Sequence, residues 1–545
     1  MRSIDIENFK LNQFSKIISK IDKSNPTDED YENVYRRKTK FELVLISLVV
    51  FGIEICYAAE TAFVSPILQK IGVPIEYTSM VWGLSPIIGF FTCPLLGSLS
   101  DDSNSSLGRR RPYIILYSLG ILIGLILTGY GHIFGNFFLV NNGVNPMIIF
   151  FTVLGVVLLD FDCDACQSPA RAYLIDVSQE EDHSVGLSTF TVMAGAGGCI
   201  GYVLGGIPWS ELTKGEDLPS DFNQSLNITP KLTYSNDDIA YSHKQILFTS
   251  VAIIYIICSI ISLTSFKEIP LYLLKKKKPI QIDTDLEDDC QSVYDYDASK
   301  SYDKISSFTY KLNISWKEKL RIYIKSIIHM PNSIWWLCIT HGFCWMSLLC
   351  YSLYFTDFVG EVIFEGIPSD EEQNSELNSL YDKGVRIGSL CMALYSISCS
   401  FYSHFLQRFI DKYGTRVVYT FSQIIYSIGM LILAITKLKV MIPITSLTAG
   451  VMYSCLFTIP FILIAKYHTQ ESFQLLIDND NPNINRGLGT DISIVSSMVF
   501  VAQFILSFFI GSLIKLIGTK TVVIYGSSFF SFCAAITAQR ISYLD

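Results

Sequence analysis

Twelve long apolar segments constrain this chain more than any other feature. Each is long enough to cross a hydrocarbon layer of ~30 Å as an α-helix, which satisfies its own backbone polar groups. Charged residues make up 17% of the 545 residues and hydrophobic residues 50%, whereas a soluble domain carries about 25% charged residues. The segments are 42–66, 77–99, 112–133, 147–169, 185–208, 244–266, 333–358, 384–405, 416–436, 441–465, 490–514 and 520–540. We therefore predict an all-α membrane protein with twelve transmembrane helices in two six-helix bundles.

Polar stretches divide the chain into regions. The two bundles are expected at 41–266 and 331–540, after an N-terminal segment at 1–40 and before a short tail at 541–545. No cleavable signal peptide is visible, so the first apolar helix would act as an uncleaved insertion signal. The stretch 267–330 is too polar to form a core, and we expect it to be largely disordered.

Lysine and arginine are concentrated in connections that an even number of spans places on one side. They lie in the N-terminal segment, in the second-to-third and eighth-to-ninth connections and in the central stretch. The positive-inside rule puts that side, with both termini, in the cytoplasm. The loop at 209–243 would face the other side, and its acceptor sequences at Asn223 and Asn227 predict glycosylation. The membrane is expected to be the plasma membrane or that of an intracellular vesicle.

A weak internal repeat links the two halves. An aspartate, a glycine and three arginines follow the second segment, and an aspartate, a glycine and an arginine follow the eighth. Positive-inside topology accounts for part of this pattern, but a carboxylate beside arginines can also pair with helix ends and hold a gate closed. The candidate gating residues are Asp101, Arg109, Arg110, Arg111, Asp176, Asp411 and Arg416.

Acidic residues interrupt the fourth apolar segment. Asp160, Asp164, Gln167 and Arg171 fall at i, i+4, i+7 and i+11, so they share one helix face. Ionisable groups at membrane depth are costly and usually functional. A carboxylate shielded from water can take up and release a proton near neutral pH, which proton coupling requires. The alternative is a buried acid–arginine pair that only joins helices. We assign proton coupling to Asp160 and Asp164.

Metal binding is a second interpretation of this segment, because Asp162, Cys163 and Cys166 are of ligand type. The residues do not share one face, and no histidine is nearby in the sequence. Most of the fourteen cysteines lie inside apolar segments, where they are expected to act as small packing residues. We therefore predict neither a metal site nor a cofactor.

The first apolar segment carries a polar and aromatic ribbon, formed by Glu54, Tyr57 and Glu60 at three-residue spacing. Carboxylates accept hydrogen bonds from hydroxyl groups, and an aromatic face packs against apolar C–H surface, so the ribbon suits a neutral polyhydroxylated solute. The alternative is a polar contact between helices. Asp357, at the end of the seventh segment, would either guard the mouth of a pathway or be solvated.

Sequence motifs of other functional classes are not found. The chain shows no phosphate-binding loop, nucleophile elbow or zinc-type spacing, and no basic patch for nucleic acid. We therefore predict that it is not an enzyme.

Several motifs resemble a known family. The paired acid–glycine–arginine loops are similar to those of the major facilitator superfamily. The motifs at 108–113, 160–176 and 355–360 resemble, more narrowly, the sucrose/proton symporter group of plant sucrose carriers and animal proton-associated sugar transporters. The first segment, from Phe51 to Glu60, resembles the animal branch. Asp162 and Asp164 stand where the plant pattern has small or amide residues.

This resemblance implies roles for individual residues. Asp160 matches the acid that carries the coupled proton, and Arg171 matches an arginine that pairs with it or helps to hold substrate. Asp101 and the arginines at 109–111 match the gating loop, and Asp357 matches an acid at the end of the seventh span. The candidate substrate-binding residues are Glu54, Tyr57, Glu60, Gln167, Arg171 and Asp357.

Together, these observations predict a monomeric proton-coupled carrier of a hexose or disaccharide that works by alternating access between two bundles. Its partners would be the sugar, protons and the lipid bilayer. Two alternatives remain open at this point. One is a carrier that exports sugar and protons from an acidic compartment, and the other is a membrane sensor or scaffold that does not transport.

Overall fold

The computed structural model describes six stretches of the chain. They are 36–137 (apart from 72, 74, 102, 104 and 106), 146–206, 236–268, 330–367, 375–469 and 488–543. The predicted glycosylation positions Asn223 and Asn227 lie outside the described residues, as do 1–35 and 269–329.

Helices make up nearly all of the described chain. In the first half they are α3 (Lys40–Ile46), α4 (Leu48–Lys70), α5 (Ile75–Asp101), α6 (Arg111–Asn136), α7 (Pro146–Asp176), the single turn η1 (Glu180–Asp182), α8 (His183–Gly206) and α10 (Asn236–Ser265). In the second half they are α14 (Asn332–Phe358), the π-helical turn η2 (Val359–Ile363), α15 (Ser375–Tyr413), α16 (Thr415–Thr436), α17 (Met441–Thr469), α19 (Leu488–Ser496), α20 (Met498–Ile517) and α21 (Thr521–Ala538).

Eleven helical segments of the described chain are long and apolar enough to cross a membrane, and the bent pair of α3 and α4 would bring the number to twelve. In this count α19 and α20 form one segment, because they are separated by a single residue. This agrees with the prediction of an all-α protein with twelve spans.

The first predicted span, 42–66, is bent rather than straight. The axes of α3 and α4 differ by 49°. Between them, the Ser47 hydroxyl donates a hydrogen bond of 2.8 Å to the carbonyl of Leu43 one turn earlier, and such bonds often bend helices. The start of α3 is fixed by Thr39 and Glu42, whose side chains each bind the other's backbone N–H.

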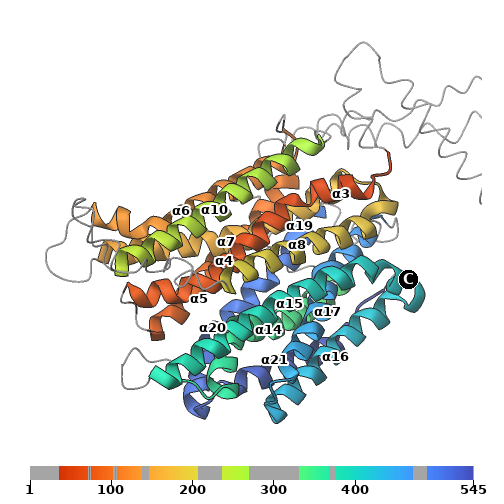
Figure 1. The fold of residues 1–545 in the computed structure, drawn as a ribbon. Coiled ribbons are helices and arrows are strands. Elements are labelled where there is room, and N and C mark those ends of the chain that lie inside the picture. Colours follow the sequence, from red (N-terminus) through yellow and green to blue (C-terminus); the bar gives the residue numbers. More distant parts are fainter. Residues whose placement is uncertain are drawn as a thin grey trace, which may run out of the picture.

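The two halves pack face to face (Figure 1). α8 packs against α15, and α5 packs against α20, so both halves contribute long helices to the interface. The short helix α19 of the second half contacts α5 and α7 of the first half. Asp101, Arg110 and Asp176 lie together at the end of the bundle where α19 begins, and we call this the arginine end.

Close packing in the first half depends on the glycines of α8. A Cβ atom at Gly197 would lie 3.0 Å from the carbonyl carbon of Phe51 on α4, and nearer still to its oxygen. At Gly201 a Cβ would overlap the side chain of Ala58, which also belongs to α4. The glycine spacing therefore lets α4 and α8 approach backbone to backbone, as is common between helices in membranes.

We expect Gly197→Ala to destabilise the protein by about 1–3 kcal/mol, because the added methyl group meets backbone atoms that cannot rotate away. Gly511→Ala on α20 is the matched control, since a Cβ there has no neighbour within 4 Å and alanine favours the helix by up to about 1 kcal/mol. Thermal unfolding of the purified protein in detergent measures both. An unchanged midpoint for Gly197→Ala would show that α4 and α8 are not in close contact.

Candidate functional site

The polar face of α7 lies in the interior of the bundle, as its spacing predicted. Asp160, Asp164, Gln167 and Arg171 are each at most 8% exposed. Asp160 accepts a hydrogen bond of 3.1 Å from the side-chain amide of Gln503 on α20. The first predicted proton carrier therefore has a hydrogen-bond partner from the other half of the protein. Asp160, one of the acids of the fourth apolar segment, is therefore not isolated within its own helix.

Glu54 on α4 belongs to the same network. Its Oε1 accepts hydrogen bonds from the Gln167 amide (3.4 Å) and from the Tyr453 hydroxyl of α17 (3.3 Å). The Gln167 carbonyl in turn accepts from Arg171 Nη2 at 3.1 Å. The amide of Gln167 thus lies between an acid and a base, and Tyr453 connects the second half to the same acid.

Glu60 and Tyr57 complete the polar ribbon of α4. Glu60 is fully buried, and neither of its carboxylate oxygens has a hydrogen-bond partner among the described residues. Both side chains interact electrostatically with Asp160 and Asp164. The ribbon therefore faces the acidic face of α7. A buried carboxylate without a donor is an acceptor ready for a hydroxyl group or a site for a proton.

Arg171 is surrounded by aromatic rings instead of carboxylates. Its guanidinium carbon lies 4.1 Å from the ring centre of Phe457, 4.2 Å from that of Phe461 and 5.2 Å from that of Phe190. The resemblance implied that Arg171 pairs with Asp160 or helps to hold substrate. In this structure Asp160 is bound by Gln503, and Arg171 is bound by Gln167 and the rings.

Tyrosines of the second half form an aromatic wall beside this network. The ring of Tyr395 on α15 lies 5.5 Å from that of Tyr453 and 5.8 Å from that of Tyr351 on α14. Tyr202 of α8 joins them at 6.2 Å from Tyr395. Sequence reasoning missed this wall, because the rings come from separate helices that no spacing rule connects.

At the arginine end, Arg110 is the central residue. Its Nη2 lies 2.6 Å from Asp101 Oδ1, and its Nε lies 2.9 Å from Asp176 Oδ2. Arg109 approaches the other oxygen of Asp176 at 3.0 Å. Burial opposes the charged form, but the carboxylates of Asp176 and Asp101 raise the pKa of Arg110 above its ordinary value. Arg110 is therefore held as a cation between the two acids.

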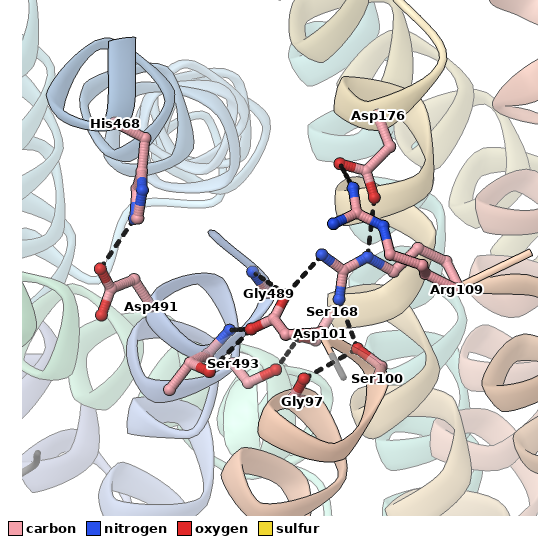
Figure 2. Close-up of polar contacts among 12 residues, drawn as sticks. Gly97, Ser100, Asp101, Arg109, Ser168, Asp176, His468, Gly489, Asp491 and Ser493 are labelled. Atoms are coloured by element: carbon pink, nitrogen blue, oxygen red, sulfur yellow. Dashed lines mark hydrogen bonds and ion pairs between the residues drawn. The ribbon is translucent and has the colours of Figure 1, made fainter. Parts of the chain in front are cut away.

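Asp101 also joins the two halves (Figure 2). It accepts hydrogen bonds from the backbone N–H groups of Gly489 (3.0 Å) and Thr490 (2.8 Å), and from the Thr490 hydroxyl (2.7 Å). These residues begin α19, where free N–H groups and the helix dipole favour an anion. Near them, the hydroxyls of Ser168 and Ser493 lie 2.6 Å apart across the same interface. Asp101, Arg109, Arg110 and Asp176 are thus brought together at the arginine end, and their gating role stays a prediction.

Glu268 also lies at the arginine end, and a role for it was not predicted from the sequence. Its carboxylate accepts the backbone N–H groups of Arg110 (2.8 Å) and Arg111 (3.0 Å), and so caps α6. Gly108, with φ of +109°, turns the chain against Glu268 where a Cβ would meet its side chain. The stretch 267–330 was predicted to be largely disordered. Of that stretch the structure describes 267, 268 and 330, and Glu268 supplies the acceptor that the start of α6 needs.

A histidine–aspartate pair lies next to this cluster, within the second half. His468 on α17 lies 2.9 Å from the fully buried Asp491 of α19, one residue after Thr490 (Figure 2). Neither residue was singled out from the sequence. The only available signal was an acid at the start of the eleventh apolar segment.

Three predicted site residues lie elsewhere. Asp357 contacts Tyr381 (2.8 Å) and Lys520 (3.2 Å) at the end opposite the arginine end. Burial opposes the charged form of Lys520, but the carboxylates of Asp357 and Glu361 raise the pKa of Lys520 above its usual value. Asp411 accepts from Gln407 on its own helix, and Arg416 lies over the ring of Tyr543. These contacts stay within the second half, so Asp411 and Arg416 are not joined to Asp101 and Arg110.

No protein-family model matches the chain. Among known proteins, the mouse membrane-associated transporter protein is 30% identical over 528 residues, covering 93% of this chain and 95% of the relative. Mouse proton-associated sugar transporter A is 26% identical and human solute carrier family 45 member 4 is 25% identical. The alignments cover 93% and 91% of this chain and 87% and 86% of those proteins.

Solved structures with the same fold include a proton:xylose symporter of the major facilitator superfamily. It has a TM-score of 0.56 at 11% identity, and the match covers 92% of this chain and 96% of that one. The fucose:proton symporter of E. coli has a TM-score of 0.50 at 14% identity, with 92% and 98% coverage. The chain therefore belongs to the solute carrier 45 family and has the fold of the major facilitator superfamily.

Proposed function

We propose that this protein carries a sugar together with a proton across a membrane by alternating access. The observation that carries this proposal is a group of four buried acids, of which Glu54 and Asp160 contact the other half: Glu54, Glu60, Asp160 and Asp164. Acids at this depth are costly unless they serve a function. The proposal is supported by relatives named as proton-associated sugar transporters and by the fold shared with sugar/proton symporters.

Asp160 is the proposed main proton site, with Asp164 one turn away on the same helix face. Asp160 accepts a hydrogen bond from the Gln503 amide, and this bond is stronger when the carboxylate is ionised. A protonated Asp160 would keep an acceptor oxygen but lose the negative charge, so the bond from Gln503 would weaken. Because Gln503 belongs to the other half, the proton on Asp160 would alter a contact that joins the halves.

The sugar is proposed to bind between the polar ribbon of α4 and the tyrosines of the second half. Glu54 and Glu60 offer acceptors for hydroxyl groups, and Glu60 has no donor of its own among the described residues. Tyr395 and Tyr453 offer ring faces for the apolar C–H face of a hexose or disaccharide. Such a site takes both halves to complete, as alternating access requires.

The arginine end is proposed to face the cytoplasm, because its connections carry most of the lysine and arginine. Both termini would then be cytoplasmic, in a plasma membrane or a vesicle membrane, and the protein is expected to act as a monomer. Asp101, bound to Arg110 and to the start of α19, would hold this side closed. Release of the sugar to the cytoplasm would require this contact to break.

We expect Asp160→Asn to abolish accumulation of sugar driven by a pH gradient while leaving passive exchange. With one coupled proton, a gradient of one pH unit is worth about 1.4 kcal/mol, or roughly tenfold accumulation. The amide variant keeps a hydrogen-bonding side chain but cannot carry a proton. The measurement is uptake of radiolabelled glucose and sucrose into proteoliposomes, with counterflow at equal pH.

The control for this experiment is Glu376→Gln, an exposed acid at the start of α15. It should accumulate sugar as the unmodified protein does. Full pH-driven accumulation by Asp160→Asn would contradict the coupling role of that residue. Absence of any pH-driven uptake by the unmodified protein, with both sugars, would contradict the proposed function itself.

We expect Asp101→Asn to open the arginine end more often, because the amide loses the charge that binds Arg110 and the start of α19. An anion at a helix N-terminus contributes about 1 kcal/mol, so the open population should rise about fivefold. Ser168→Cys places a thiol at the interface, and its reaction with a maleimide can be followed on that peptide by mass spectrometry.

The matched control is Asp411→Asn, which removes the acid that the sequence repeat equates with Asp101. Its contact stays on its own helix, so labelling should not change. Equal labelling of the two variants would show that the contact with α19 does not hold the arginine end closed.

A further inference from the structure

The surroundings of Arg171 point to a function for two rings of the second half. The arginine belongs to α7 in the first half, whereas Phe457 and Phe461 belong to α17 in the second half. Their ring centres lie 4.1 Å and 4.2 Å from the guanidinium carbon. All three side chains are at most 2% exposed. The contact is therefore a cation–π contact that crosses the interface between the halves and is shielded from bulk water.

The positive charge of Arg171 is balanced in an unusual way. A buried cation normally has a carboxylate partner. Among the described residues, the side-chain hydrogen bond of Arg171 is with a neutral amide, Gln167, and its Nε has no partner. Cation–π contacts strengthen when they are shielded from water. The rings of Phe457 and Phe461, and the more distant ring of Phe190 on α8 of the same half as Arg171, therefore surround the guanidinium.

Carboxylates are nevertheless close to Arg171 within its own half. Gln167 bridges Arg171 and Glu54, with hydrogen bonds of 3.1 Å and 3.4 Å. The titratable groups that interact electrostatically with Arg171 are Tyr453 on α17, Glu54 on α4, Asp164 on α7, Cys93 on α5 and His341 on α14. Glu54 is thus separated from the guanidinium by a single bridging amide, and both Glu54 and Asp164 interact with its charge.

We propose that Phe457 and Phe461 are positioning residues that hold Arg171 away from Glu54 and Asp164 while the arginine end is closed. When the halves separate at that end, the two rings move off with α17, and Arg171 keeps only Gln167 and the more distant ring of Phe190 from its own half. Arg171 then pairs with Glu54 or Asp164. The acid that is paired gives its proton to water at the opened end and remains as the carboxylate of the new ion pair. Opening and proton release are coupled in this way, and this step rests on the proposed function.

The first experiment separates cation–π attraction from simple packing. Phenylalanine at 457 or 461 is replaced by its mono-, di- and trifluorinated analogues, which keep the ring shape but progressively weaken the negative face. With the Ser168→Cys thiol as reporter, labelling should rise stepwise, by roughly two- to thirtyfold across the series. The same series at Phe529, a ring of α21 that is 61% exposed, should leave labelling unchanged.

The second experiment tests the acids. Phe457→Leu should move the pH of half-maximal labelling to lower pH, because a freed Arg171 favours ionisation of the acid beside it. Phe457→Tyr keeps an aromatic ring at this position and should show the same pH profile of labelling as the unmodified protein. In a Glu54→Gln, Asp164→Asn background the shift should vanish, which is the coupling expected of residues that act on one another.

Two outcomes would overturn the proposal. One is a fluorination series at 457 and 461 that changes labelling no more than the series at Phe529. The other is a shift of the pH profile by Phe457→Leu that persists when both acids are neutralised. Both readouts are labelling of the purified protein and need no sugar. A failure here is therefore distinct from a failure of pH-driven uptake, which would instead contradict the proposed function.

Discussion

Burial of charge in an apolar bundle is the constraint on which the arrangement of the two halves depends. Acids on α4 and α7 and an arginine on α7 are shielded from water, where a charge without a partner is costly. Several of those partners come from the other half. Gln503 binds Asp160, Tyr453 binds Glu54, and the rings of Phe457 and Phe461 hold Arg171. Glu54, Asp160 and Arg171 thus belong to the first half, and the second half supplies the neutral groups that contact them.

This division has a consequence for movement. A neutral amide, hydroxyl or ring stabilises a buried charge less than a carboxylate–arginine pair would at the same depth. The halves are therefore joined at the centre by contacts of moderate strength, which can break and re-form. The stronger charge contacts lie at the arginine end, where Asp101 binds both Arg110 and the backbone at the start of α19. Under the proposed function, closure would therefore be concentrated at the arginine end, and the contacts at the centre would rearrange.

Much of the fold was predictable because hydrophobicity and helical periodicity are local properties. The spans followed from the apolar segments, and the shared face of Asp160, Asp164, Gln167 and Arg171 followed from 3.6 residues per turn. The bend at Ser47 and the extension of α15 to Ser375–Tyr413, well beyond the predicted 384–405, were not foreseen. A hydroxyl that bonds back to its own helix, and polar turns that continue a helix outside an apolar segment, leave weak traces in hydropathy.

The sequence by itself determined the class of the protein, the side of each helix that carries charge and the residue types available for proton and sugar. It placed Asp101 and the three arginines in one loop, but it gave no reason to choose Arg110 as the central one. Tertiary structure decided that choice, because Gly108 turns the loop and Glu268, 158 positions from Arg110, fixes the start of α6. It likewise decided that Asp411 and Arg416 stay apart from the gate, and that Arg171 meets rings instead of Asp160. The contacts of Arg110 with Glu268 and of Arg171 with Phe457 join residues more than a hundred positions apart. They depend on how helices pack within a half and, for Arg171, on how the two halves dock, and not on any local pattern.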